Sequence, residues 1–178
     1  MKKIVAIVFS LTVAVNFGKA QKNNVLFSVG PAILIPSYSG INSNGFGVGA
    51  SFEYVLTKKV SIASDIDINF FTSNIKNVFT HKVTNGFAIM PVLAGVKWGA
   101  VKNIYLSGKA GMAVGLKNAG TNLTLSPGIG YLFNIKGKQK IDMGIRLIGV
   151  LPKASLPENT FLEKGGYSFL AFKLAYQF

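Results

Sequence analysis

Eight charged residues stand at alternate positions within otherwise apolar stretches, where an isolated charge is costly. Four are acids and four are bases: Glu53, Asp65, Asp67, Lys97, Lys109, Asp142, Arg146 and Lys173. A charge that is taken out of water is expensive unless an opposite charge pairs with it. Because the two signs are equal in number, we expect these residues to form ion pairs inside the folded chain.

Residue types that support catalysis or metal binding are sparse. The chain has one histidine, His81, and no cysteine. A catalytic nucleophile needs a neighbouring base, and no Ser or Asp is spaced to form a triad with His81. A metal site needs several ligands of this kind. We predict no catalytic residue, no metal, no cofactor and no enzyme activity, with a lipid-hydrolysing enzyme that uses His81 as the alternative.

The net charge is +13, from 19 Lys and Arg against 6 Asp and Glu, although 49% of the residues are hydrophobic. Proteins that bind nucleic acid usually carry a basic stripe or a recognition motif. Only one of the 19 basic residues is an arginine, and beyond residue 20 no run of basic residues is longer than two. The sequence therefore argues against nucleic acid as a partner.

The first twenty residues have the pattern of a secretory signal peptide. A basic start at 1–3 precedes an apolar run at 4–15, and 18–20 has small residues at both specificity positions of a cleavage site. The run is shorter than the roughly 18 residues that a spanning helix needs. We predict that 1–20 is a signal peptide and that 21–178 is exported as a single domain with a net charge of +10.

After residue 21, apolar residues alternate with small or polar ones. In 60–70, nearly every second residue is Val, Ile or Phe, and the residues between them are Ser, Ala, Asp or Asn. A period of two is typical of β-strands. The pattern predicts eight strands, at 24–35, 45–56, 60–71, 85–98, 104–116, 123–135, 141–151 and 167–178.

The connections between these strands alternate in length. Short ones at 57–59, 99–103 and 136–140 alternate with mostly longer ones at 36–44, 72–84, 117–122 and 152–166. A β-sandwich has no reason for this alternation, whereas an outer-membrane barrel has short periplasmic turns and long external loops. The strands also exceed the roughly 5 to 6 residues typical of soluble sheets. We predict an all-β fold, an eight-stranded antiparallel up-and-down transmembrane barrel.

In such a barrel, large apolar residues face lipid and small or polar residues fill the lumen. The eight charged residues fall on the inner face, so acids of the second and third strands are expected to meet bases of the fourth, fifth, seventh and eighth. Counted from the turns, Glu53, Asp65, Lys109, Arg146 and Lys173 are expected to form one layer. The prediction is a plugged lumen without a wide aqueous pore.

The final strand alternates Leu170, Phe172, Leu174, Tyr176 and Phe178 with the residues between them, and the sequence ends on an aromatic ring. With the pattern of 21–178, this ending resembles the porin-like, small eight-stranded outer-membrane β-barrels of Gram-negative bacteria, the outer-membrane protein β-barrel domain. The resemblance implies an outer-membrane location, a monomer, and contact with outer-membrane lipids including lipopolysaccharide. It also implies that the barrel-assembly machinery recognises Tyr176 and Phe178 as an assembly signal.

Lysines gather in the connections. The short turns hold Lys58, Lys59, Lys102, Lys136, Lys138 and Lys140 and no acid. A lysine near an anionic lipid surface gains on the order of 1 kcal/mol, so this rim is expected to contact lipid phosphates on the periplasmic side. Aromatic residues near the strand ends, with Phe46, Phe70 and Phe87 on the loop side, are expected at headgroup level.

The function that follows from these patterns is non-enzymatic. We predict a structural or surface-interaction role in the cell envelope for a barrel whose lumen is largely plugged. The alternative is a narrow porin-like channel for small or apolar solutes.

Overall fold

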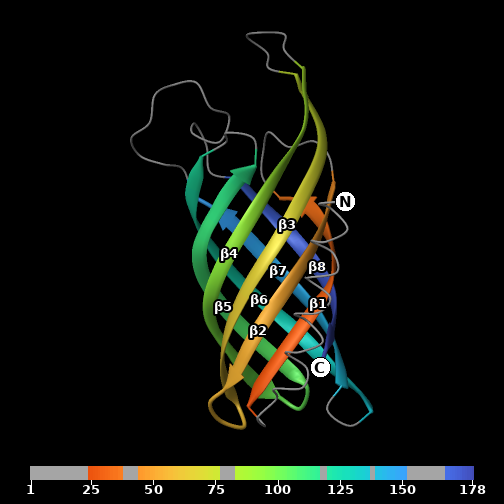
Figure 1. Cartoon of the computed structure of the whole chain (residues 1–178), viewed down its shortest axis with the longest axis vertical. Coiled ribbons are helices and arrows are strands. Elements are labelled where there is room, and N and C mark those ends of the chain that lie inside the picture. The colour runs from red at the N-terminus through yellow and green to blue at the C-terminus, as the bar shows by residue number, and fades with distance from the viewer. Residues whose placement is uncertain (1–23, 38–43, 77–82, 117–119, 137–138, 152–166) are drawn as a thin grey trace, which may run out of the picture.

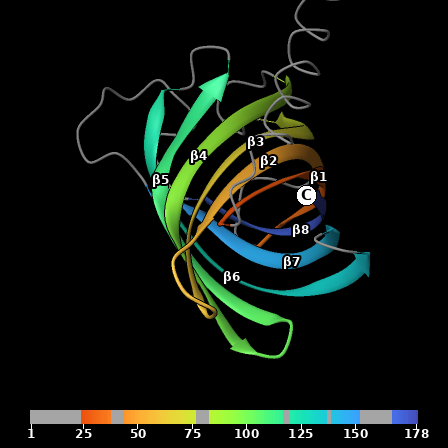
Figure 2. The same cartoon turned by 60° about the horizontal axis from the view of Figure 1, so that its bottom comes forward.

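Eight antiparallel strands form a closed barrel in the computed structural model of the chain (Figure 1). The structure describes residues 24–37, 44–76, 83–116, 120–136, 139–151 and 167–178. The strands are β1 (Val25–Pro36), β2 (Gly45–Val55), β3 (Val60–Lys76), β4 (Val83–Val101), β5 (Ile104–Leu116), β6 (Thr121–Lys136), β7 (Gln139–Val150) and β8 (Tyr167–Gln177). Each strand pairs with its neighbours in the chain, and β8 pairs with β1 to complete the ring (Figure 2). The predicted fold class is therefore confirmed.

The two ends of the barrel differ in their connections. Residues 56–59, 102–103 and 137–138 join strands at one end, the turn end, which is at the bottom of Figure 1. The strand ends that the other four connections join lie at the opposite end, the loop end. Asn103 has a φ of 66°, a left-handed conformation that Asn tolerates, and this lets the chain reverse within two residues. The C-terminus of β8 also lies at the turn end.

The hairpin of β3 and β4 is longer than the sequence predicts. Residues 72–84 were expected as a connection, but β3 continues to Lys76 and β4 begins at Val83. The register shifts between Phe71 and Asn74, so the pairing resumes past an irregularity. Backbone hydrogen bonds hold paired strands together, and they do not require alternating apolar residues. The strands were predicted from that alternation, which ends near Phe71, so the prediction stopped too early.

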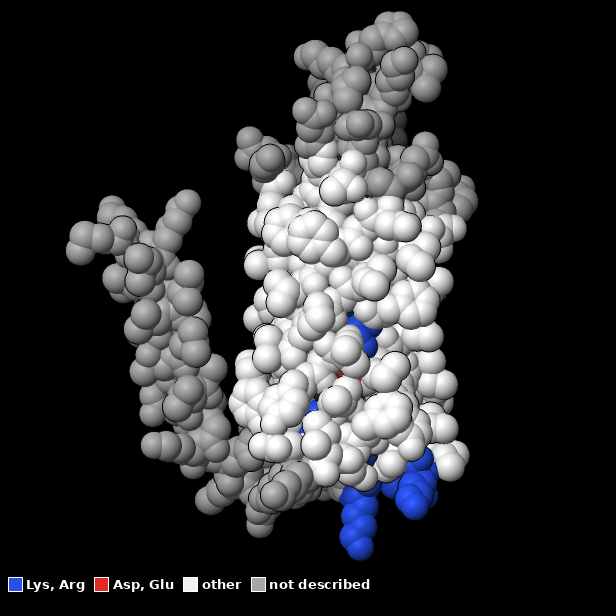
Figure 3. Space-filling model, turned by 90° about the vertical axis from the view of Figure 1, so that its right-hand side faces the viewer, with Lys and Arg blue, Asp and Glu red and all other residues white. Residues whose placement is uncertain are grey.

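The outer wall of the barrel is apolar. Side chains such as Ile33, Phe46, Ile66 and Met112 are more than half exposed there. Figure 3 shows a face with almost no charge on the wall and Lys or Arg gathered at the turn end. Among the described residues, no helix has the length and apolar character that crossing a membrane would require.

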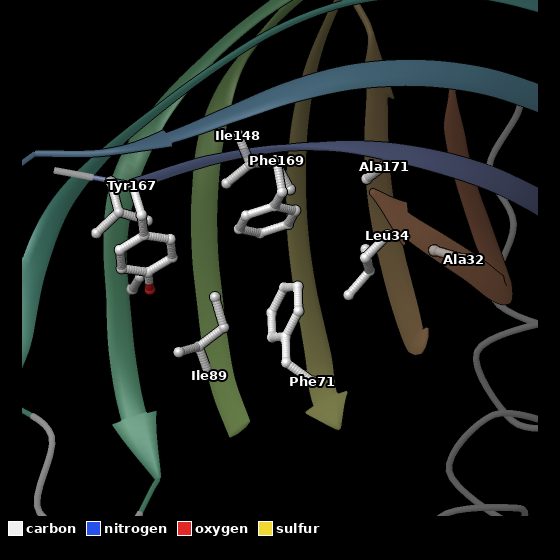
Figure 4. Packing of buried hydrophobic residues seen from close by; sticks show 10 residues of the cluster. Ala32, Leu34, Phe71, Ile89, Ile148, Tyr167, Phe169 and Ala171 are labelled. Carbon is white, nitrogen blue, oxygen red and sulfur yellow. The ribbon is translucent and has the colours of Figure 1, made fainter. Parts of the chain in front are cut away.

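Large apolar residues also lie inside the barrel, contrary to the expectation that only small and polar residues fill the lumen. Ten buried residues form an apolar cluster near the loop end: Ala32, Leu34, Phe71, Ile89, Ala113, Ile148, Val150, Tyr167, Phe169 and Ala171 (Figure 4). Phe87, expected at headgroup level, packs against this cluster and stacks on Phe71 at 4.8 Å between ring centroids. Phe87 alternates in phase with the buried Ile89, which fixes its inward direction.

Candidate functional site

The eight charged residues predicted for the lumen all lie inside the barrel and join two clusters of ion pairs. We call Asp65, Asp67, Lys109, Arg146 and Lys173 the central cluster, and Glu53, Lys97 and Asp142 the turn-side cluster. Their side chains are between 1% and 15% exposed. Strand alternation positions them, because each occupies an inward position on its strand.

Arg146 holds the central cluster together from β7. Its Nη1 donates to Asp65 Oδ2 at 2.5 Å and its Nη2 donates to Asp67 Oδ2 at 2.9 Å. Both acids lie on β3, which does not pair with β7, so the guanidinium bridges the lumen. Forked contacts of this kind exploit the planar geometry of arginine. One residue therefore ties two opposite walls of the barrel.

Two lysines complete the central cluster. Lys109 of β5 donates to Asp65 Oδ2 at 2.5 Å. Lys173 of β8 donates to Asp67 Oδ1 at 3.3 Å and to Ser51 Oγ at 2.8 Å. The cluster therefore contains three bases and two acids, and it links β2, β3, β5, β7 and β8.

Lys97 is the centre of the turn-side cluster. Its Nζ donates to Glu53 Oε2 at 3.1 Å and to Asp142 Oδ2 at 3.0 Å, and it lies 3.8 Å from the centroid of the Tyr105 ring. Tyr105 donates its hydroxyl hydrogen to Asp142 Oδ1 at 2.5 Å, and Ser61 donates to Glu53 Oε1 at 2.6 Å. A single base thus serves two acids, so the excess negative charge here balances the excess positive charge of the central cluster.

The expectation that one layer would include Glu53 with Asp65, Lys109, Arg146 and Lys173 is wrong. Neighbouring strands are staggered, so the residue of β2 paired with Asp65 is Ser51, and Glu53 pairs with Ala63. Glu53 therefore lies one inward position closer to the turn end and reaches Lys97 instead. The acids of β2 and β3 do meet bases of β4, β5, β7 and β8.

Tyr105 is a polar lumen residue that the sequence patterns did not predict. It lies four residues before Lys109 on β5 and so has the same inward direction, which was the available signal. Gly130 and Gly144 make room for it, because a Cβ on Gly130 would collide with the Tyr105 ring and one on Gly144 would lie 2.9 Å from its hydroxyl oxygen. The glycines of β6 and β7 therefore shape the wall against which the ring packs.

The remaining predicted residues lie at the ends of the barrel or outside the described chain. Tyr176 is 40% exposed on the outer wall, and Phe178 packs edge-on against Phe27 of β1, with ring centroids 5.3 Å apart. Their role as an assembly signal stays a prediction. His81 and the predicted signal peptide, 1–20, lie outside the described residues. Within the described residues, no group of three or more side chains that could hold a metal ion occurs.

The lysine-rich turns are partly described. Lys58, Lys59 and Lys102 are exposed, and Lys140 is half-buried, whereas the side chains of Lys136 and Lys138 lie outside the described part. All four acids of the described ranges line the lumen in ion pairs. The described outer surface therefore carries lysine without a compensating carboxylate.

Comparisons by sequence show no match to a family model and none to a curated protein. Solved structures match the fold at low identity. Neisserial surface protein A (NspA) is 14% identical with a TM-score of 0.60, and the match covers 86% of this chain and 95% of that one. Ail, the attachment invasion locus protein of Yersinia pestis, is 15% identical with a TM-score of 0.53, over 89% and 100%. The outer membrane protein OprG from Pseudomonas aeruginosa is 10% identical with a TM-score of 0.52, over 87% and 95%.

At these identities the comparisons concern the fold. In each case nearly the whole of the other chain is matched, so the likeness extends over the complete barrel. The closed ring of eight antiparallel strands and the apolar outer wall agree with it. The chain therefore has the fold of the small eight-stranded outer-membrane β-barrels.

Proposed function

We propose that the chain is a non-enzymatic outer-membrane β-barrel with a plugged lumen and a structural or surface-interaction role in the cell envelope. The observation that carries this proposal is that side chains from different walls meet inside the barrel: Arg146 reaches both acids of β3, and Phe71 packs against Phe169. Side chains that meet in this way occupy the space through which a solute would pass. A cavity of about 30 Å³ lies among the charged side chains, roughly the volume for a water or two.

The plugged lumen predicts an electrically silent barrel. The full mature protein, 21–178, reconstituted in a planar lipid bilayer, is expected to show no large and stable conductance steps, because side chains from both walls fill the lumen. Protein-free bilayers with the same detergent serve as the control. Large, stable steps at a single amplitude would contradict the plug and support the alternative, a narrow porin-like channel for small or apolar solutes.

The turn end supports a second part of the proposal, contact with anionic lipid headgroups. Lys58, Lys59 and Lys102 are exposed at this end. Trp98 is 48% exposed and Tyr54 is 44% exposed on the adjoining wall, as expected of aromatic residues at a membrane interface. We infer that this end faces the phosphates of the periplasmic leaflet. The long loops hold Lys76, Lys82, Lys117, Lys153 and Lys164, whose side chains lie outside the described part, and their contact with lipopolysaccharide stays a prediction.

Neutralising the first turn is expected to weaken this lipid contact. Anionic lipid should raise the free energy of unfolding of the wild type relative to zwitterionic lipid. In the K58Q/K59Q variant this gain should fall by on the order of 1 kcal/mol per lysine at low salt. Unfolding in vesicles of the two compositions measures it, with K58R/K59R, which keeps both positive charges, as the control. An unchanged gain in K58Q/K59Q would rule out the turn as a headgroup contact.

A further inference from the structure

The lumen changes its chemistry along its length. The turn-side and central clusters fill the half nearer the turn end with charged side chains. The apolar cluster fills the half nearer the loop end, where Leu34, Ile89, Ile148 and Phe169 are fully buried at 0% exposure. A solute that crossed the barrel would meet these two regions in series.

The apolar cluster reaches across the barrel, and the buried polar residues Asn69, Asn122 and Thr124 line the wall beside it. Its ten residues come from six of the eight strands, β1, β3, β4, β5, β7 and β8. Phe71 of β3 and Phe169 of β8, which are not paired strands, point toward each other with ring centroids 5.2 Å apart (Figure 4). Leu34 and Ile148 pack around the two rings. Side chains from opposite walls therefore meet across the lumen.

The charged half is less completely closed. The cavity of about 30 Å³ lies among Glu53, Asp65, Lys97, Lys109 and Arg146. Two buried atoms at its lining, Asp65 Oδ1 and Arg146 Nε, have no hydrogen-bond partner in the protein. One accepts and the other donates a hydrogen bond, so polar groups on this surface favour water or a hydrated ion. The apolar cluster contains one such atom, the Tyr167 hydroxyl oxygen, among side chains that are otherwise apolar.

An ion meets different resistance in the two halves. In the charged half, carboxylates, ammonium groups and the guanidinium replace part of the water that the ion loses. In the apolar cluster, only the Tyr167 hydroxyl is polar, so an ion would lose nearly all of its water without replacement, and burial of a charge without a partner is very costly. Hydrophobic constrictions close channels in this way by excluding water.

We propose that the apolar cluster is the permeation barrier of the lumen and that the ion-pair network is not. The proposal rests on the plugged lumen of the proposed function and assigns the plug to particular residues. The network instead ties the walls of the barrel together, while the rings of Phe71 and Phe169 keep water and ions from crossing.

Conductance of three folded variants in planar bilayers tests this assignment. F71A/F169A removes both rings from the cluster and is expected to show conductance steps that the wild type lacks. F70A/F172A makes the same change on the same strands but on the outer wall, where each ring is 38% exposed, and it should stay silent. D65N/K109M removes an acid and a base of the network together, and it should also stay silent.

Folding of each variant is verified by its β-sheet circular dichroism and its shifted migration in unheated gels. L34N, which adds an amide to the cluster with the same number of non-hydrogen atoms, replaces F71A/F169A if that variant does not fold. It should conduct, because the amide admits water to the constriction. Silence of the folded cluster variant, or conductance by D65N/K109M, would overturn the assignment while leaving the plug intact. Conductance by the wild type would instead refute the plug itself.

Discussion

Replacing Asp65 with asparagine is expected to lower the free energy of unfolding by about 3–5 kcal/mol, the typical cost of removing one partner from a buried ion pair. Asp65 is 1% exposed and accepts from both Lys109 and Arg146. Arg146 keeps its second acid, Asp67, but Lys109 loses the one carboxylate with which it forms an ion pair among the described residues. A buried ammonium is then left without a counter-charge.

The double variant D65N/K109M provides the matched comparison. It removes one charge of each sign, so the central cluster keeps its net charge and no lysine is left alone. Its loss of stability should be clearly smaller than that of D65N, and with the single variant K109M the set gives a coupling energy in a double-mutant cycle. Lys58→Met, a change on the exposed first turn, should stay within about 0.5 kcal/mol of the wild type in zwitterionic lipid, where the lysine has no anionic headgroup to contact.

Urea unfolding in lipid vesicles measures these differences. Trp98, the single tryptophan, lies on the outer wall and reports by its fluorescence when the chain leaves the bilayer. A loss below about 1 kcal/mol in D65N would place this pair in the range of solvent-exposed salt bridges. The same result would contradict a stabilising role for the central cluster.

The sequence could predict which charges enter the lumen but not which of them pair. Asp65 and Lys109 stand in phase with small residues on their strands, and alternation alone gives their inward direction. Their pairing depends on the stagger between strands, which sets Ser51 rather than Glu53 beside Asp65. No single strand encodes that offset, so the expected single layer is replaced by two clusters.

The apolar cluster was missed for a related reason. Phe71 and Phe169 also have inward phase, but near the loop end large apolar residues occur on both faces of the strands, and the two faces cannot be told apart by hydrophobicity. Phe71 and Phe169 are close in space because β3 and β8 curve toward each other around the barrel, although they are far apart in sequence. Only the closed ring brings them into contact.

Gly30→Ala is expected to damage the seam at which β1 and β8 close the barrel. A Cβ at Gly30 would collide with the backbone carbonyl oxygen of Leu174 and would lie 2.5 Å from the Cα of Ala175. These are backbone atoms of the facing strand, so no side-chain rotation can relieve the overlap. Overpacking of this kind costs about 1–3 kcal/mol and sometimes more.

The seam has little capacity to absorb the change. Pro31 follows Gly30 and has no backbone N–H to donate to β8. β1 and β8 pair on either side of this site, at Val29 with Tyr176 and at Ala32 with Lys173. A displacement of the backbone at Gly30 would therefore strain both of these pairings. Phe27 and Phe178 exchange two backbone hydrogen bonds at the turn end, and these would also be strained if β1 and β8 moved apart.

Gly108→Ala is the matched control for this prediction. Gly108 lies on the exposed outer face of β5, and a Cβ there would meet no atom within 4 Å. Loss of glycine flexibility in the unfolded chain should make that variant neutral or slightly more stable. Urea unfolding of both variants, with gel migration of the unheated protein as a measure of barrel closure, compares the same added methyl group in two surroundings. Equal stabilities would mean that β1 and β8 can separate at Gly30 without cost, and the seam would then not constrain the barrel.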